Sequence, residues 1–181
     1  MDLSGSRPQV GSVDTAGFEL IDINGSGLAD TVSVTGTAGD DEVSIMPSGA
    51  GIEITGLSVD LAVTGGEALE LDSGHGNDHL DVTGNTVTIA TNTSIISGAT
   101  TADITYENLE SASVFTNAGV QLTVGGSAGY SVVPNAASDE GTILTDSLTV
   151  EYDGFGAGTT ISIDGDLEVT ASDADDNLTV A

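Results

Sequence analysis

Residues 32–45 read VSVTGTAGDDEVSI and residues 69–82 read LELDSGHGNDHLDV, and the two stretches align without a gap. Each contains two apolar residues separated by one position, then a glycine-rich acidic turn that ends in aspartate, then a second such apolar pair. Apolar residues at every second position are typical of strands with one buried face. Each stretch therefore predicts a strand, an acidic turn and a second strand, and the alignment indicates an internal repeat.

Two weaker copies extend this repeat. Residues 167–180, LEVTASDADDNLTV, align with both stretches without a gap and keep the aspartate that ends the turn. Residues 109–122 form a fainter copy, in which Ala118 takes the place of that aspartate. The repeat is therefore expected to continue in degenerate form through the second half of the chain.

Alternating apolar residues between the copies predict additional strands. They occur as the pairs Ile52/Ile54, Leu61/Val63 and Val87/Ile89. With these pairs included, equivalent strands recur every 17 to 20 residues, the length of one two-sided coil. We therefore expect an all-β fold, a parallel β-solenoid (β-roll or β-helix) of roughly 18–20 residues per coil with one continuous core. An antiparallel β-sandwich of short strands is the alternative, because both folds share this periodicity.

The chain is expected to form one continuous array with three parts. These are an N-terminal extension at 1–17, a β-repeat unit at 18–100 and a second, degenerate unit at 101–181. The division follows from the register, which weakens beyond Thr91. Helices are not expected, since Thr, Val and Gly are poor helix formers and no stretch keeps a helical apolar period.

The charge balance limits the partners of the chain. It has 29 acidic residues and a single basic residue, Arg7, which gives a formal net charge of -28. Nucleic acid is excluded as a partner, because phosphate binding needs clustered Lys and Arg. The carboxylates also repel one another and destabilise a compact state unless something neutralises them. Bound divalent cations would do so, and adaptation to a high-salt environment is the rival explanation.

The sequence lacks the residues that form several stabilising cross-links. The chain has no cysteine and no lysine, so disulfides, thiolate metal sites and Lys–Asn isopeptide bonds are excluded.

No apolar run approaches the ~20 residues of a membrane span, and a basic-then-apolar signal pattern is absent. We expect a mature or excised piece of an exported protein, stabilised by strand packing or by cations.

The turn of the second copy resembles a known calcium-binding motif. Residues 74–80, GHGNDHL, resemble the nonapeptide G-G-x-G-x-D-x-L-x of haemolysin-type (RTX) repeats, with Ser73 in place of the first glycine. More broadly, residues 27–82 resemble the tandem modules of very large bacterial secreted and cell-surface proteins. The resemblance implies a calcium-bound β-roll, in which glycines allow tight turns, aspartate supplies an anionic oxygen and leucine enters the core.

The same resemblance implies a set of calcium ligands. Asp78 would bind through its side chain, with backbone oxygens of Ser73 and His75 assisting, and Asp41 and Asp176 occupy the equivalent position. The complete set of candidate ligands is Asp40, Asp41, Asp72, Ser73, His75, Asn77, Asp78, Asp173, Asp175 and Asp176.

One departure from the family pattern concerns the coil expected between Asp41 and Asp78. Its turn at 55–59, TGLSV, has no carboxylate, whereas the family places calcium between turns that both carry the motif. We therefore expect fewer or weaker sites, or sites completed by Asp60 and Asp72. Ordinary turn chemistry is the competing explanation, because Asp, Asn and Gly also recur in tight turns without any metal.

Enzymatic activity is not expected. A polysaccharide lyase of β-helix type needs Lys or Arg beside the substrate carboxylate, and only Arg7 exists. Glycoside hydrolysis needs two converging carboxylates, but the pairs present are sequence neighbours, which often point apart. Aromatic residues, which form sugar-binding platforms, make up 3% of the chain. His75 and His79 flank Asp78 without a third nitrogen ligand, and we expect both to be solvent-exposed turn residues.

The sequence as a whole favours a calcium-stabilised structural or adhesive repeat module, extracellular or on a bacterial cell surface. Its expected partners are calcium ions, further copies joined through terminal strands, and surface glycans. Such a module would suit a filament, a surface layer or a biofilm matrix. A β-helical polysaccharide-degrading enzyme or a carbohydrate-binding module is the alternative.

Overall fold

The computed structural model describes residues 20–24, 30–57, 60–65, 68–84, 86–100, 102–115, 121–135, 140–153 and 160–169. Across these ranges the chain forms fifteen β-strands and no helix, so the all-β class is confirmed. They accordingly contain no helix of the length and apolar character that a membrane span requires. The expected N-terminal extension at 1–17 lies outside the described residues.

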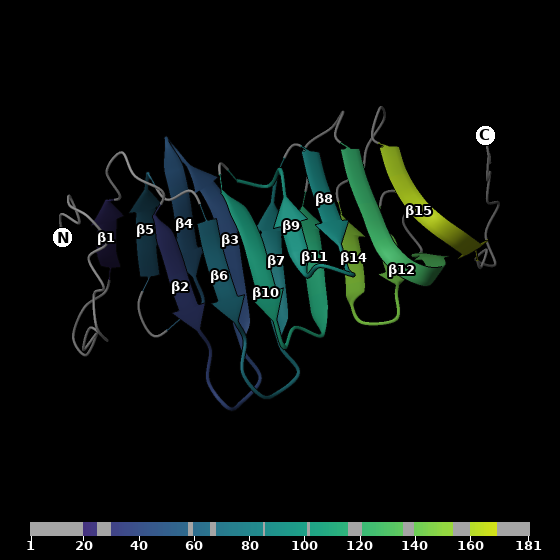
Figure 1. Ribbon diagram of the computed structural model, residues 1–181, viewed down its shortest axis with the longest axis horizontal. Coiled ribbons are helices and arrows are strands. Elements are labelled where there is room, and N and C mark those ends of the chain that lie inside the picture. Colours follow the sequence, from purple (N-terminus) through teal and green to yellow (C-terminus); the bar gives the residue numbers. More distant parts are fainter. Residues whose placement is uncertain are drawn as a thin grey trace.

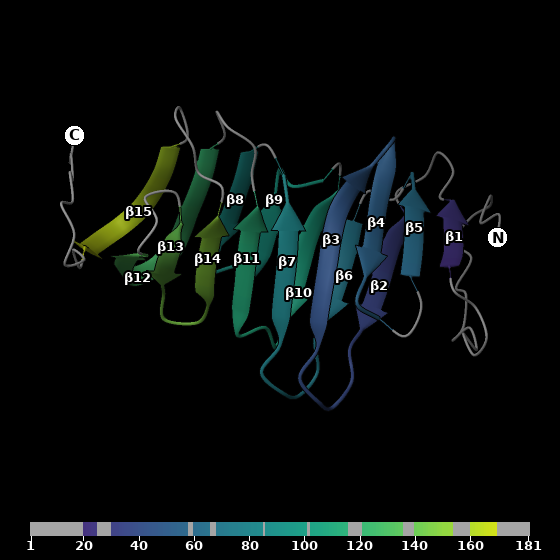
Figure 2. The same ribbon diagram turned by 180° about the vertical axis from the view of Figure 1, so that it is seen from behind.

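The strands lie in two layers on either side of one apolar core (Figures 1 and 2). The front layer of Figure 1 contains, in order, β2 (Thr31–Thr35), β6 (Ala68–Asp72), β10 (Asp103–Glu107), β9 (Ile95–Ser97), β8 (Thr86–Ala90), β12 (Gln121–Pro134) and β15 (Thr160–Val169). The front layer of Figure 2 contains β1 (Leu20–Asn24), β5 (Asp60–Thr64), β4 (Gly51–Thr55), β3 (Glu42–Ser48), β7 (His79–Thr83), β11 (Ser111–Phe115), β14 (Thr149–Asp153) and β13 (Gly141–Leu144). The layers are continuous through β12, whose first half pairs with β8 and whose end pairs with β13.

Parallel pairing stacks successive copies of the repeat on one another. β6 pairs with β2 and β10, and β7 pairs with β3 and β11, all in parallel. Eight of the pairings in the described residues are parallel and six are antiparallel, the latter within hairpins or meanders of the coils. The predicted parallel β-solenoid is thus confirmed.

The predicted coil length, in contrast, is wrong. Val32 is the partner of Leu69, and Asp41 contacts Asp78 across an interval of 37 residues, not of 18–20. The reason is the turn at Gly49 and Ala50. Gly49 has a φ of 61°, the left-handed conformation that two-residue hairpin turns need.

This turn makes β4 a hairpin strand of β3. Ser48 and Gly51 are antiparallel partners, so only two residues connect the strands. Parallel strands need a crossover of about a dozen residues or more, which excludes a new coil at this point. Ile52 consequently pairs with Val63 of β5 and does not stack on Val32.

Columns of buried side chains run along the solenoid axis. Val43, Leu80, Ala112 and Val150 are successive partners on β3, β7, β11 and β14, and none is more than 1% exposed. The apolar pairs of the repeat therefore form the core, as their alternation predicts.

The third unit of the repeat does not lie where the sequence alignment placed it. Ile104 of β10 is the partner of Leu69, so this unit spans β10 and β11 and not residues 109–122. Ser111 is the partner of His79, which puts Glu110 at the position of Asp78. An acidic residue thus occupies this position in all three stacked units.

Candidate cation site at the stacked acidic turns

Three turns lie side by side at one edge of the solenoid, where β2, β6 and β10 lead into β3, β7 and β11 (Figure 1). They comprise residues 36–41, 73–78 and 108–110 and are called the turn stack below. Backbone bonds join them: Gly36 N–H donates to the Asp72 carbonyl at 2.8 Å, and Ser73 N–H donates to the Glu107 carbonyl at 3.1 Å. The two aligned acidic turns are therefore immediate neighbours, and residues 55–59 do not separate them.

Glycine is required where the first two turns meet. A Cβ on Gly36 would collide with the carbonyl oxygen of Ser73, and one on Gly74 would collide with that of Thr37. Gly74 also has a φ of 96°, a conformation in which other residues are strained. These glycines allow the contact between turns as well as the reversal of the chain.

A ladder of carboxylate–amide hydrogen bonds crosses the turn stack. The backbone N–H of Asp41 donates to Oδ1 of Asp78 at 2.8 Å, and the N–H of Asp78 donates to Oε2 of Glu110 at 2.9 Å. Each carboxylate therefore binds the amide of the equivalent residue in the preceding unit. Hydrogen bonds of this kind are stronger than neutral ones, because one partner is ionised.

The carboxylates of the first turn have other partners. Asn77 N–H donates to Oδ1 of Asp40 at 2.9 Å, which links the second turn back to the first. The Asp41 carboxylate accepts the N–H of Thr37 at 2.6 Å and lies within hydrogen-bond distance of the Thr37 hydroxyl. Asp41 thus closes its own turn, since no earlier acidic turn precedes it in the described residues.

The second and third turns are joined through Asp72. Its Oδ1 accepts the side-chain amide of Asn108 at 2.8 Å and the N–H of Gly74 at 3.2 Å. Asn108 has a φ of 56°, which asparagine tolerates better than most residues. Asp72 therefore organises its own turn and the next one together.

Two buried oxygens of the second turn have no hydrogen-bond partner. Ser73 and Asp78 are each 1% exposed, and neither Oγ of Ser73 nor Oδ2 of Asp78 meets a donor or acceptor. A buried polar atom without a partner is destabilising, and more so when it carries charge. A ligand such as a water molecule or a cation would satisfy both atoms.

The structure brings together seven of the ten predicted ligands, all of which lie in or beside the first two turns. They are Asp40, Asp41, Asp72, Ser73, His75, Asn77 and Asp78. Asp173, Asp175 and Asp176 lie outside the described residues. Sequence comparison missed Glu110 and Asn108, because the third turn is shorter than the other two. Asp60 lies on β5, beyond β4 and β3, and does not complete this site.

Side chains alone do not make a complete metal site in the part of the chain that the structure describes. No three Asp, Glu or His side chains converge there in a way that would hold a metal ion. A cation between the turns would need backbone carbonyls, the Ser73 hydroxyl or water in addition to the Asp78 carboxylate. Calcium accepts such mixed oxygen ligands, whereas most transition metals favour nitrogen or sulfur.

His79 does not lie in the turn, contrary to expectation. It belongs to β7, and its side chain is only 26% exposed. Its Nδ1 lies 2.7 Å from the Ser111 hydroxyl, and its Nε2 lies 2.8 Å from that of Ser113 and 3.2 Å from Oδ1 of Asp81. The two serine contacts tie β7 to β11. His75 is exposed, as predicted.

Fold and site together define a two-layered β-solenoid with an acidic, hydrogen-bonded turn stack along one edge. Comparisons of the chain with protein-family models, with curated proteins and with solved structures find no match.

Proposed function

We propose that the chain is a non-catalytic structural module, extracellular or on a cell surface, whose turn stack binds calcium and is stabilised by it. The observation that carries this proposal is Oδ2 of Asp78, a buried carboxylate oxygen without a hydrogen-bond partner amid stacked acidic turns. A bound cation would neutralise this oxygen and remove its desolvation cost.

The donor atoms fit calcium better than other biological cations. The second turn holds another buried oxygen without a partner, the Ser73 hydroxyl, and backbone carbonyls of Thr37 and Ser73 lie where the first two turns meet. All of these are hard oxygen ligands. Calcium takes about six to eight oxygens in flexible geometry, including carbonyls and water. Magnesium demands a stricter octahedron and keeps several waters, so a small turn suits it less well.

Overall charge supports the same function. With a formal net charge of -28, the folded chain is destabilised by repulsion among its carboxylates. A divalent cation held between the stacked acidic turns would offset part of this repulsion. Because a ligand that binds only the folded state stabilises it by mass action, a calcium-rich medium outside the cell would favour folding after export.

The carboxylates of the turn stack are engaged in structural contacts, which supports a mechanical role. Those of Asp40, Asp41, Asp78 and Glu110 each accept a backbone N–H. A catalytic acid or base must be available to its substrate. The carboxylates of Asp40, Asp78 and Glu110 instead hold adjacent turns together, and that of Asp41 closes its own turn. A stalk, a matrix component or an adhesive spacer is the corresponding function.

Self-assembly through the ends of the solenoid belongs to the same proposal. Among the described strands, β2 pairs only with β6 and β15 pairs only with β12, so each has one edge without a partner strand. Such edges are templates for strand addition. We expect calcium to promote end-to-end association, measured as a rise in mass by light scattering; monomers at high concentration with calcium present would contradict it.

Thermal unfolding in CaCl2, MgCl2 and NaCl at equal ionic strength tests the calcium function. The unchanged protein should melt at a clearly higher temperature in CaCl2 than in the other two salts. Asp78→Asn should lose most of this difference, while Asp103→Asn, an equal charge change on an exposed residue of β10, should keep it. Equal stabilisation by NaCl and CaCl2 would refute calcium binding and favour adaptation to high salt.

A further inference from the structure

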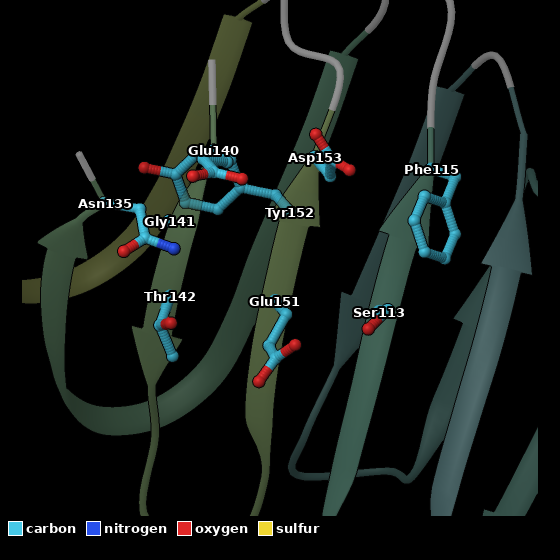
Figure 3. A pocket seen from close by; sticks show the side chains of 9 residues that line it. All are labelled: Ser113, Phe115, Asn135, Glu140, Gly141, Thr142, Glu151, Tyr152 and Asp153. Carbon is cyan, nitrogen blue, oxygen red and sulfur yellow. The ribbon is translucent and has the colours of Figure 1, made fainter. Parts of the chain in front are cut away.

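A cavity opens on the layer that contains β11, β14 and β13, away from the turn stack (Figure 3). It has a volume of about 230 Å³. Two aromatic side chains, Phe115 and Tyr152, and three carboxylates, Glu140, Glu151 and Asp153, line it. The cavity thus combines flat apolar surface with concentrated negative charge.

Strand register explains why these groups converge. Phe115 of β11 is the partner of Asp153 of β14, and Ser113 is the partner of Glu151. Residues two apart on a strand share a face, so Glu151 and Asp153 both point outward beside β11. Glu140 precedes β13, the antiparallel neighbour of β14, and lies next to Tyr152 in Figure 3.

Phe115 is the unusual member of this group. The whole chain has three phenylalanines, three tyrosines and no tryptophan. Tyr106 and Tyr130 are buried in the core, whereas Phe115 is 39% exposed at the cavity. An exposed ring beside a hollow is a common feature of binding sites, because aromatic side chains bury much surface on contact.

Guanidinium groups match this combination of ring and carboxylates. They stack on aromatic faces and form paired hydrogen bonds with carboxylates, and the methylene stem of arginine packs on apolar surface. We propose that the cavity binds an arginine side chain of a basic partner polypeptide. The ring of Phe115 packs against the guanidinium, and Glu151 and Asp153 supply the opposite charge.

Charge complementarity identifies the partner as a different protein. A second copy of this chain offers one arginine, no lysine and a net charge of -28, so it is repelled from an acidic cavity. A basic polypeptide is attracted to the same surface, and the attraction increases its association rate. This inference is independent of the calcium function, because none of the cavity residues belongs to the turn stack.

Fluorescence anisotropy with a labelled tetra-arginine peptide, at physiological ionic strength and with calcium present, tests this site. Glu151→Gln/Asp153→Asn should weaken binding about tenfold or more, as expected for the loss of charge-assisted hydrogen bonds. Phe115→Ala should weaken it about two- to fivefold through the lost cation–π contact. The control Asp103→Asn/Glu107→Gln makes the same charge change on exposed positions of β10 and should change affinity less than twofold.

Thermal unfolding of each variant verifies that it is folded before binding is compared. Equal losses in the cavity variant and the β10 control would show unspecific attraction to an acidic protein and overturn the proposal. The absence of measurable binding by the unchanged protein would overturn it as well.

Discussion

The side chain of Asp78 accepts a hydrogen bond at 2.8 Å from the backbone N–H of Asp41, 37 residues earlier in the chain. Residues at the same position of successive repeats are therefore bonded to each other directly. Asp78 donates its own N–H to Glu110 in turn, so one acidic position connects three coils. The carboxylates at this edge therefore help to join the coils. A cation would add its contacts to turns that are already hydrogen-bonded to each other.

Close contact between the turns predicts the effect of enlarging Gly74. Gly74→Ala should destabilise the fold by more than about 1 kcal/mol, because the new Cβ meets the Thr37 carbonyl and the φ of 96° strains alanine. Gly49→Ala is the matched control, since Gly49 also has a positive φ, 61°, but has nothing within 4 Å of an added Cβ. Urea unfolding of both variants in calcium measures the difference. Equal destabilisation would mean that backbone strain alone, and not the stacking of turns, requires glycine at position 74.

Glu110 should stabilise the fold despite its exposed position. Glu110→Ala removes the acceptor of the Asp78 N–H and should lower the free energy of unfolding by about 1–3 kcal/mol, the usual cost of leaving a partly buried donor unpaired. Glu107→Ala, at the end of β10, removes another exposed carboxylate and serves as the control. If both variants unfold at the same denaturant concentration, the carboxylate–amide ladder does not extend to the third turn.

Tyr106 and Tyr130 should respond differently to loss of the hydroxyl. Oη of Tyr106 is buried without a hydrogen-bond partner, so Tyr106→Phe should leave stability unchanged or increase it. Oη of Tyr130 accepts the N–H of Ser127 at 2.7 Å, so Tyr130→Phe should cost about 0.5–1.5 kcal/mol. Denaturant unfolding distinguishes the two outcomes, and a larger loss at Tyr106 than at Tyr130 would contradict these environments.

Alkaline pH should destabilise the fold through its buried phenols. Burial raises the pKa of Tyr106 and of Tyr152 above the ordinary value of 10.0. The unfolded chain then loses these protons first, so their contribution to stability is complete below pH 10 and decreases as the pH rises through the folded-state pKa. Unfolding free energies between about pH 9 and 11 should fall less steeply for Tyr106→Phe than for the unchanged protein. Identical slopes would show that general charge repulsion alone causes the loss.

The alternation of apolar and polar residues predicted which faces of the repeated strands are buried. It did not predict the course of the chain between one repeat and the next. The alternation of Val32 and Leu69 with polar neighbours placed both in parallel strands with one buried face, and they are partners in the structure. The predicted coil length is wrong because an alternating apolar pair predicts a strand but does not indicate whether that strand starts a new coil or folds back on the preceding strand. The two-residue turn at Gly49 and Ala50 folds β4 back on β3. A short connection that contains glycine was the sequence signal for this hairpin.

Parts of the candidate site had no counterpart in the sequence pattern. In the second unit Leu71 and Leu80 are nine positions apart, whereas their partners Tyr106 and Ala112 are six positions apart. A gapless alignment therefore missed Glu110. The buried oxygens of Ser73 and Asp78 depend on which atoms surround them, and spacing along the chain carries no such information.

Calorimetric titration of calcium into the unchanged protein and into Asp78→Asn, at fixed ionic strength and with Asp103→Asn as control, tests the central claim most directly. Saturable binding is expected in the unchanged protein and in the control, with the heat lost or the affinity lowered by tenfold or more when the buried charge is removed. Identical isotherms for all three proteins, or no saturable heat in any of them, would contradict a cation at the stacked turns.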